Sequence, residues 1–266
     1  MQPIAIFGMT GRMGQSLLRA LRELPGPLAL CGAIASPQSG RLGRDAAGEG
    51  APTGVLITSD INQGIRGAAV AADFSLGVCV AAHARACAAA GIPILIGATG
   101  IDAANRAALE QAAAVIPVLI APNTSVGVSV VAKLVSVAAL GLGPAYDVEI
   151  SEVHHRMKRD APSGTALALG EAIAQARSQS LRDVAIYDRT GQGAARTPGS
   201  IGFSSLRAGD IVGEHTVTFA SAGERVEITH RATDRITFAR GALRAAEWLV
   251  GRPAGLYGMQ DVLGLV

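Results

Sequence analysis

The sequence predicts an α/β fold with two domains, and three observations support this prediction. Over the first 125 of the 266 residues, short apolar runs alternate with helix-like segments, which is typical of a parallel sheet covered by helices on both faces. From Val126 onward the strand-like segments become richer in Thr and Val and alternate in polarity, which indicates an α+β domain with a largely antiparallel sheet. The 33 glycines and the 3% aromatic content indicate close packing of helices on a sheet.

The expected elements follow in order along the chain. Short apolar strands bounded by turn residues are expected at 4–7, 28–34, 55–57, 68–72, 92–96 and 118–121, and helices at 13–24, 78–90 and 103–114, the last with Asp102 as its N-cap. The second domain then has helices at 126–140 and 165–177 and strands at 148–153, 211–219 and 224–230. A last helix at 239–250 is expected to return to the first domain. The domains are therefore expected at 1–125 with 236–266, and at 126–235.

Composition and charge argue against several classes of protein. A net charge of +2 without basic runs between aromatic residues does not suggest a nucleic-acid partner. The three cysteines lie in apolar runs without Cys-x-x-Cys spacing, so we expect reduced core residues rather than disulfides or a zinc site. The chain enters a strand-like segment without a basic leader, and prolines interrupt its uncharged stretch at 111–132. We therefore expect a cytoplasmic protein that does not bind membranes.

A glycine-rich loop follows the first expected strand. Gly8, Gly11 and Gly14 have the spacing Gly-x-x-Gly-x-x-Gly and precede an expected helix. Such glycines permit a tight turn and a close approach of the backbone to a pyrophosphate, which the helix N-terminus stabilises. We interpret the first domain as a Rossmann-type nucleotide-binding domain; a plain tight turn is the alternative.

The residue that usually binds the ribose in such domains is missing. An Asp or Glu is expected at the end of the second strand, but this strand is followed by Ser36 and Pro37, and the next acidic residue is Asp45. Nothing there repels a 2′-phosphate, and Arg41 or Arg44 could reach one. This favours NADPH, although solvated surface arginines are an equal alternative.

A charged motif in the second domain has the chemistry of an active site. Five residues that can carry positive charge occur within six positions: His154, His155, Arg156, Lys158 and Arg159. They precede the start of an apolar helix, where the N–H groups of Gly164 and Thr165 can bind a carboxylate. Lys158 is one of only two lysines among 23 basic residues. The motif suits a small, multiply anionic substrate, with histidines that can donate protons near neutral pH.

Alternatives apply to each histidine. The motif could be a solvated charge run, while His83 is expected to be structural and His215 and His230 to be hydrogen-bonded sheet residues. A metal site at His154 and His155 is improbable, because adjacent strand residues point to opposite faces. The same alternation implies that only one of the two faces the reacting carbon.

Short motifs in order along essentially the whole chain resemble the dihydrodipicolinate reductase family of bacterial lysine biosynthesis. They are GMTGRMG, DFS, GATG, APNTSVGV, EVHHRMKRDAPSGTA and RAGDIVGEH. The resemblance implies a Rossmann domain, a substrate-binding and tetramerisation domain, a homotetramer, NADPH and/or NADH as cofactor, and no metal. It implies reduction of a cyclic dicarboxylate, 4-hydroxy-tetrahydrodipicolinate, through dihydrodipicolinate to tetrahydrodipicolinate. Another Rossmann oxidoreductase and a non-catalytic NADPH-sensing protein are the alternatives.

The resemblance also implies roles for individual residues. His154 and Lys158 match catalytic proton donors, and the substrate contacts are His155, Gly164 and Thr165. The cofactor contacts are Gly8, Met9, Thr10, Gly11, Arg12, Met13, Ser36, Gly97, Ala98, Thr99, Ala121, Pro122, Asn123 and Thr124. Relatives often carry an acid and a base at the positions of Ser36 and Pro37, so cofactor choice is open here, and Pro122 and Thr124 also depart from the pattern. Physically, a protonated His154 can donate to a carbanion-like carbon and Lys158 can hold a carboxylate.

Overall fold

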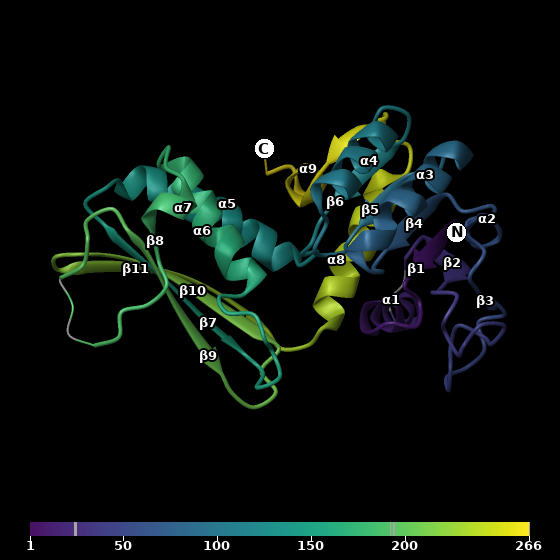
Figure 1. The fold of residues 1–266 in the computed structure, drawn as a ribbon, viewed down its shortest axis with the longest axis horizontal. Coiled ribbons are helices and arrows are strands. Elements are labelled where there is room, and N and C mark those ends of the chain that lie inside the picture. Colours follow the sequence, from purple (N-terminus) through teal and green to yellow (C-terminus); the bar gives the residue numbers. More distant parts are fainter. Residues whose placement is uncertain (24–25, 192, 194, 266) are drawn as a thin grey trace. The chain divides into compact units, whose positions relative to one another are not determined.

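A computed structural model describes residues 1–23, 26–191, 193 and 195–265 (Figure 1). The chain divides into two compact units, which we call the first unit (Met1–Val126 with Ile236–Val266) and the second unit (Gly127–Arg235). Leu24, the last residue of the helix expected at 13–24, and Val266, the last of the first domain, lie outside the described residues. The roles expected for the two domains remain predictions.

The first unit is built on a seven-stranded sheet in which every described pairing is parallel, as expected. Its strands, in spatial order, are β12 (Gly255–Tyr257), β6 (Pro117–Ile120), β5 (Ile94–Ile96), β4 (Val70–Asp73), β1 (Gln2–Phe7), β2 (Leu28–Ile34) and β3 (Ile57–Thr58). The strand order reverses at β1, which pairs with β2 on one side and β4 on the other. Ligands of such sheets bind outside the carboxyl ends of the strands at this point.

Helices cover both faces of this sheet (Figure 1). On one face α1 (Arg12–Glu23) and α8 (Ile236–Leu249) pack with residues such as Leu17 and Ala242. On the other face α3 (Val80–Ala90) and α4 (Ala103–Ala113) bury Ala84 and Leu109. The expected N-cap of α4 is confirmed, because the Asp102 side chain accepts a hydrogen bond from the Asn105 N–H at 2.7 Å. The short helices of the unit are α2 (Ile61–Gly64), η1 (Gly77–Cys79) and α9 (Met259–Leu263).

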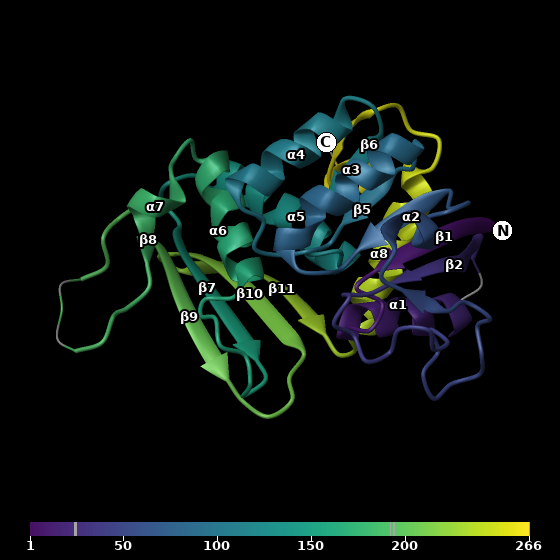
Figure 2. The same cartoon turned by 45° about the vertical axis from the view of Figure 1, so that its right-hand side comes forward.

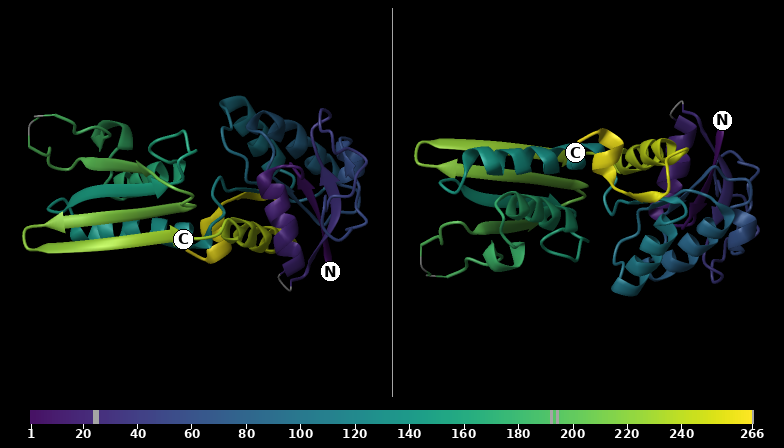
Figure 3. Two further views of the ribbon diagram at one scale, coloured as in Figure 1. Left: turned by 90° about the horizontal axis from the view of Figure 1, so that it is seen from below. Right: turned by 90° about the horizontal axis from the view of Figure 1, so that it is seen from above.

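The second unit is a five-stranded sheet with helices on one face. In spatial order its strands are β11 (Glu224–Ala232), β10 (Gly213–Ser221), β7 (Asp147–His154), β9 (Ile201–Arg207) and β8 (Ala185–Ile186). Figures 2 and 3 show α5 (Val126–Leu142) and α6 (Gly164–Ala176) along the same face of this sheet. Val148, Ile150, Leu169 and Phe219 form part of the core between them. A short helix, α7 (Leu181–Val184), follows α6.

The sheet of the second unit is mixed. Its longest strands are antiparallel, since β10 pairs in that way with both β7 and β11. Strand β9, which the sequence pattern did not predict, runs parallel to β7 and to β8. Its sequence, IGFSSLR, has only three buried residues at its start, so it lacks the alternation that marks a half-buried strand.

Candidate active site

Strand β7 brings two chemically active side chains to the buried face of the second unit. Because side chains alternate along a strand, Glu152 and His154 point to the same face as Val148 and Ile150, and all four are buried. Glu152 is only 1% exposed and His154 8%. A carboxylate and an imidazole placed so deeply require partners, since unpaired buried charges are strongly unfavourable.

Glu152 has a partner for each carboxylate oxygen. Its Oε2 lies 2.5 Å from His154 Nδ1 and accepts from Arg207 Nη1 at 2.8 Å. Its Oε1 accepts from Arg207 Nη2 at 2.7 Å and from the Ser163 N–H at 3.1 Å. The guanidinium therefore binds the carboxylate with two parallel bonds, the geometry typical of strong Arg–carboxylate pairs. Arg207 Nη2 also donates to the Asp160 carbonyl at 2.6 Å, which ties the charged motif to β9.

These contacts shift the pKa values of the pair. Burial raises the pKa of Glu152, but hydrogen bonds from Arg207, His154 and Ser205 outweigh burial and bring it to about 2. Burial lowers the pKa of His154, whereas the hydrogen bond and charge of Glu152 raise it. The charges of Lys158 and Arg207 lower it further, and the resulting pKa lies below the ordinary value of histidine. The carboxylate is thus ionised, and it can accept a hydrogen bond from His154 Nδ1 but cannot donate one.

The N-terminus of α6 adjoins this pair. Ser163 is the N-cap, and its Oγ accepts from the Ala166 N–H at 3.1 Å and lies 2.9 Å from His215 Nε2. Burial lowers the pKa of His215 to about 4, so it is neutral at pH 7. Its ring meets the His154 ring edge-on, with 5.1 Å between centroids. Gly164 and Thr165 form the first turn, whose N–H groups point out of the helix end.

The loop after β7 carries Lys158. Its Nζ donates to both carboxylate oxygens of Asp160, at 2.9 Å each. The charge of Lys158 is also one of the causes that lower the pKa of His154. The neighbouring histidine, His155, has a different partner, with Nε2 at 3.1 Å from Arg235 Nη2. As strand alternation predicts, the two histidines do not share one set of contacts.

The glycine loop of the first unit fits a nucleotide. Gly8 has φ +75°, and a Cβ there would lie 2.6 Å from the Phe74 carbonyl oxygen; a Cβ on Gly14 would lie 2.7 Å from Met9 Cα. Only glycine allows this close packing of the loop, which starts α1 at the carboxyl end of β1. The first turn of α1 therefore lies at the carboxyl end of β1, where the strand order reverses, the position at which such sheets bind a pyrophosphate.

The other expected cofactor residues follow neighbouring strands at the same edge of the sheet. Gly97, Ala98 and Thr99 come after β5, and Ala121, Pro122, Asn123 and Thr124 come after β6. Two of the expected cofactor residues have side chains that the protein itself occupies. The Met9 side chain is fully buried in the core, and the Thr124 hydroxyl donates to the Phe238 carbonyl of α8 at 2.7 Å.

The position after β2 at which an acid usually binds the ribose is occupied by Ser36. Ser36 is exposed, and its Oγ contacts the side chain of Gln38. The Asp45 carboxylate is turned into its own loop, where backbone N–H groups, chiefly that of Thr53, lower its pKa to about 2. Arg41 donates to the Ala46 carbonyl at 3.3 Å, and Arg44 is exposed.

Comparison with known proteins agrees with this geometry. Residues 2–124 match the family model described as dihydrodipicolinate reductase, N-terminus, and residues 127–263 match dihydrodipicolinate reductase, C-terminus. The chain belongs to the dihydrodipicolinate reductase family. The resemblance of the sequence motifs to this family is thereby confirmed.

Relatives of this dihydrodipicolinate reductase family member match over nearly its full length. A 4-hydroxy-tetrahydrodipicolinate reductase from Thiobacillus denitrificans is 50% identical over 98% of both chains, and one from Anaeromyxobacter dehalogenans is 49% identical over 100% of this chain and 98% of the relative. A dipicolinate-bound dihydrodipicolinate reductase from Paenisporosarcina sp. TG-14 shares the fold, with a TM-score of 0.76, 24% identity and coverage of 98% and 99%.

Sequence reasoning missed three side chains that surround His154 in this reductase family member. Glu152 and Arg207 were not singled out, and His215 was assigned only to the sheet. Strand alternation could have placed Glu152 beside His154, and the motifs EVHHRMK and RAGDIVGEH contain all three. The described residues hold no group of three or more His, Cys, Asp or Glu suited to a metal ion. None of the described helices is long and apolar enough to span a membrane.

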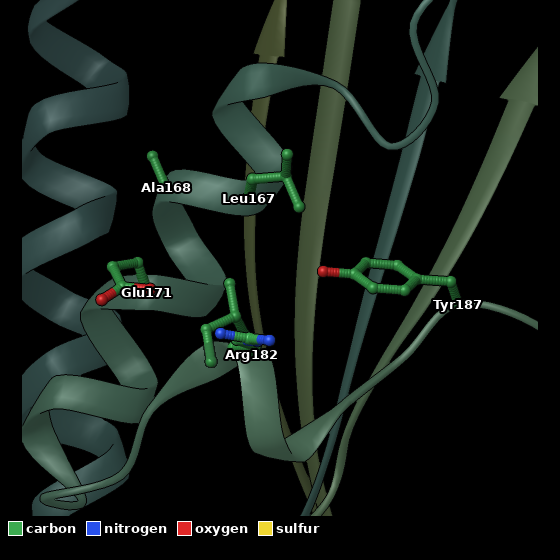
Figure 4. A pocket seen from close by; sticks show the side chains of 6 residues that line it. Leu167, Ala168, Glu171, Arg182 and Tyr187 are labelled. Atoms are coloured by element: carbon green, nitrogen blue, oxygen red, sulfur yellow. The ribbon is translucent and has the colours of Figure 1, made fainter. Parts of the chain in front are cut away.

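A pocket of about 520 Å³ lies elsewhere in the second unit, between α6, α7 and the segment after β8. Its lining residues are Leu167, Ala168, Glu171, Leu181, Arg182 and Tyr187. Figure 4 shows the Tyr187 hydroxyl pointing toward the helix that carries Leu167. No residue expected in the active site lines this pocket, and we assign it no part in the reaction.

Proposed function

We propose that the chain reduces 4-hydroxy-tetrahydrodipicolinate, through dihydrodipicolinate, to tetrahydrodipicolinate with NAD(P)H, a step of lysine biosynthesis. The observation that carries the proposal is His154, held by a buried carboxylate beside Lys158 and the N-terminus of α6. An imidazole among cationic groups suits protonation of a multiply anionic substrate. Relatives about 50% identical over the full chain carry the name of this reaction.

His154 donates the proton in this proposal. Its Nδ1 is bound to Glu152, so the proton that leaves is on Nε2. When the ring of the substrate gains a hydride at one carbon, the adjacent carbon of the conjugated system becomes electron-rich and takes this proton. The pKa of the buried imidazole lies below its ordinary value, and a bound dicarboxylate raises it again because nearby negative charge favours the protonated form.

Lys158 and the start of α6 hold the carboxylates of the substrate. In the structure, the Lys158 ammonium binds the exposed carboxylate of Asp160. Such exposed ion pairs contribute only about 0–1 kcal/mol, so a substrate carboxylate can replace Asp160 at little cost. The N–H groups of Gly164 and Thr165 bind the same or the second carboxylate, and His155 adds a further contact.

The first unit holds the cofactor, which supplies the hydride when bound. The backbone from Gly8 to Met13 binds its pyrophosphate, and the loops after β5 and β6 position its other end. Ser36 provides no negative charge against a 2′-phosphate, so NADPH serves at least as well as NADH. We also propose a homotetramer, on the resemblance to the family alone.

A single absorbance assay tests the proposal. The purified chain is mixed with NADPH and freshly prepared 4-hydroxy-tetrahydrodipicolinate, and absorbance is followed at the nicotinamide band. We expect a loss of absorbance that depends on both compounds. Binding of NADPH without turnover would indicate a nucleotide sensor, and turnover only with other carbonyl or imine substrates would indicate a different oxidoreductase.

A further inference from the structure

We propose that Glu152 is a positioning residue for His154: it fixes the proton on Nδ1, so that Nε2 alone exchanges a proton with the substrate. This inference rests on the proposed function for its kinetic consequences, but the geometry itself can be tested on the free protein. A positioning role is distinct from a merely structural ion pair with Arg207, because it requires the tautomer and the pKa of His154 to depend on Glu152.

The contacts of Glu152 support this role. Oε2 lies 2.5 Å from His154 Nδ1, and two bonds from Arg207 together with the Ser163 N–H fix the carboxylate in place. Arg207 and Ser163 both donate hydrogen bonds, and an ionised carboxylate can only accept them. Nδ1 of His154 must therefore carry the hydrogen of its own hydrogen bond to Glu152. Nε2 is then the nitrogen that is protonated in the acid form and bare in the neutral form.

The surroundings of Nε2 leave space beside it. A Cβ on Gly213 would lie 2.9 Å from it, so the absence of a side chain at this position of β10 leaves room next to the tip of the ring. No hydrogen bond to Nε2 occurs among the described residues of the structure. An imidazole with one nitrogen bound to a carboxylate and the other open is the arrangement of a directed proton donor.

The charged and titratable groups around His154 come from every neighbouring element. Glu152 lies on the same strand, Arg207 on β9 and His215 on β10, while Lys158 and Asp160 belong to the following loop. His230 of β11 lies one strand further, beside His215. Among those that act on the pKa of His154, only Glu152 raises it, and Lys158 and Arg207 lower it. Removing the charge of Glu152 must therefore lower the pKa of His154.

The test uses Glu152→Gln in the full-length chain. The amide keeps the size of the side chain but can donate to Nδ1, which favours the opposite tautomer. We expect the high-pH limb of the kcat profile, where the proton donor is lost, to move about one unit or more to lower pH, and kcat to fall about 10²-fold. Glu152→Asp restores the charge and should return the limb toward its original pH.

Glu149→Gln is the matched control. Glu149 lies on the same strand but on the other face, where it pairs with Arg189 at 2.9 Å and Arg196 at 3.2 Å. This variant loses ion pairs of β7 without touching His154, so its pH profile should equal that of the unmodified chain. A folded Glu152→Gln variant with an unchanged pH limb would overturn the proposal.

A second measurement needs no turnover and reads the tautomer in the unmodified chain. In the unmodified chain labelled with ¹⁵N-histidine, two-bond ¹H–¹⁵N spectra at high pH report the tautomer of His154, assigned by loss of its signals in His154→Gln. We expect hydrogen on Nδ1. Hydrogen on Nε2 would refute the positioning role even if the reductase assay succeeds, whereas a failed reductase assay with hydrogen on Nδ1 would refute only the proposed function.

Discussion

Gly213→Ala places one methyl group against the atom from which we expect the proton to leave. Gly213 begins β10, and its missing side chain is the space next to the His154 ring: a Cβ would lie 2.9 Å from Nε2 and 3.2 Å from Cδ2. Gly213 does not have a positive φ, so alanine can adopt its backbone without strain. The substitution changes no charge and no hydrogen-bonding group. Its effect on kcat therefore reports how freely the substrate can reach Nε2.

The size of the effect follows from these contacts. Ordinary contact begins near 3.4 Å, so the ring or the strand must move by roughly 0.5 Å, and the Glu152 bond at 2.5 Å resists movement of the ring. Overpacking of this kind costs about 1–3 kcal/mol of stability. At roughly 2–4 °C per kcal/mol for a chain of this size, the unfolding temperature should fall by several degrees. The methyl also occupies the approach to Nε2, and a misplacement of about 1 Å lowers catalysis by roughly 10²-fold.

The assay measures kcat, NADPH affinity and thermal unfolding of the same preparation. We expect kcat to fall about 10²-fold with NADPH affinity unchanged, because the glycine loop belongs to the first unit. Gly141→Ala serves as control, since Gly141 is exposed in α5 and its Cβ would meet nothing within 4 Å; it should keep full activity and gain about 0.5–1 kcal/mol of stability. A folded Gly213→Ala variant with kcat within about twofold of the unmodified chain would show that Nε2 is not the donating atom.

Three further predictions concern other parts of the molecule. Lys158→Ala should lose most turnover while unfolding and NADPH binding stay unchanged, and Lys158→Arg should also fail because the guanidinium is larger and planar; full activity in either variant would contradict the role of the ammonium. Ser36→Glu should shift the ratio of kcat/KM by about tenfold or more toward NADH, since a carboxylate accepts from ribose hydroxyls and repels a 2′-phosphate; steady-state assays with both cofactors decide this. Burial lowers the pKa of His215 to about 4, so as pH falls below 6.5 the unfolded chain binds a proton on this histidine before the folded chain does. The free energy of unfolding therefore decreases by up to about 1.4 kcal/mol per pH unit down to pH 4. Urea unfolding at pH 7 and pH 5 should show a smaller loss of unfolding free energy for His215→Gln than for the unmodified chain.

The sequence predicted the long helices and most apolar strands of the first sheet, and it missed β9 and most of the shortest elements. Apolar runs placed β2, and helical periodicity placed α4, almost to the residue, because β2 is a mostly apolar run and the buried positions of α4 recur at helical spacing. Elements such as α2 and β12 have three or four residues, too few for periodicity to be visible. Strand β9 was missed for a different reason: only its first three residues are buried, and its position depends on its partners β7 and β8.

The candidate site was predictable in its charged motif but not in its support. The cluster of basic residues and the start of α6 are contiguous in sequence, so composition and capping rules find them. Glu152 could be related to His154 by strand alternation, yet Arg207 lies 55 residues further along the chain from Glu152. Only the pairing of β7 with β9 shows that Arg207 neutralises Glu152, and no local pattern encodes that pairing.

The mixed character of the second sheet explains why these groups meet. Strands β7 and β9 run parallel, with His154 opposite Arg207 in the register, so both strands deliver their carboxyl ends to one edge. Strand β10 is antiparallel to β7 and brings its beginning, Gly213 and His215, to the same edge. If β9 ran antiparallel, its amino end would lie beside His154, and Ile201 would replace Arg207 there. Glu152 would then lose the two guanidinium hydrogen bonds that help to offset its burial and would keep only those from His154 and Ser163, so its pKa would rise. A protonated Glu152 is a weaker acceptor than the carboxylate and would favour hydrogen on Nδ1 of His154 less strongly, so the direction of a single strand bears on which nitrogen of the proposed donor carries the proton.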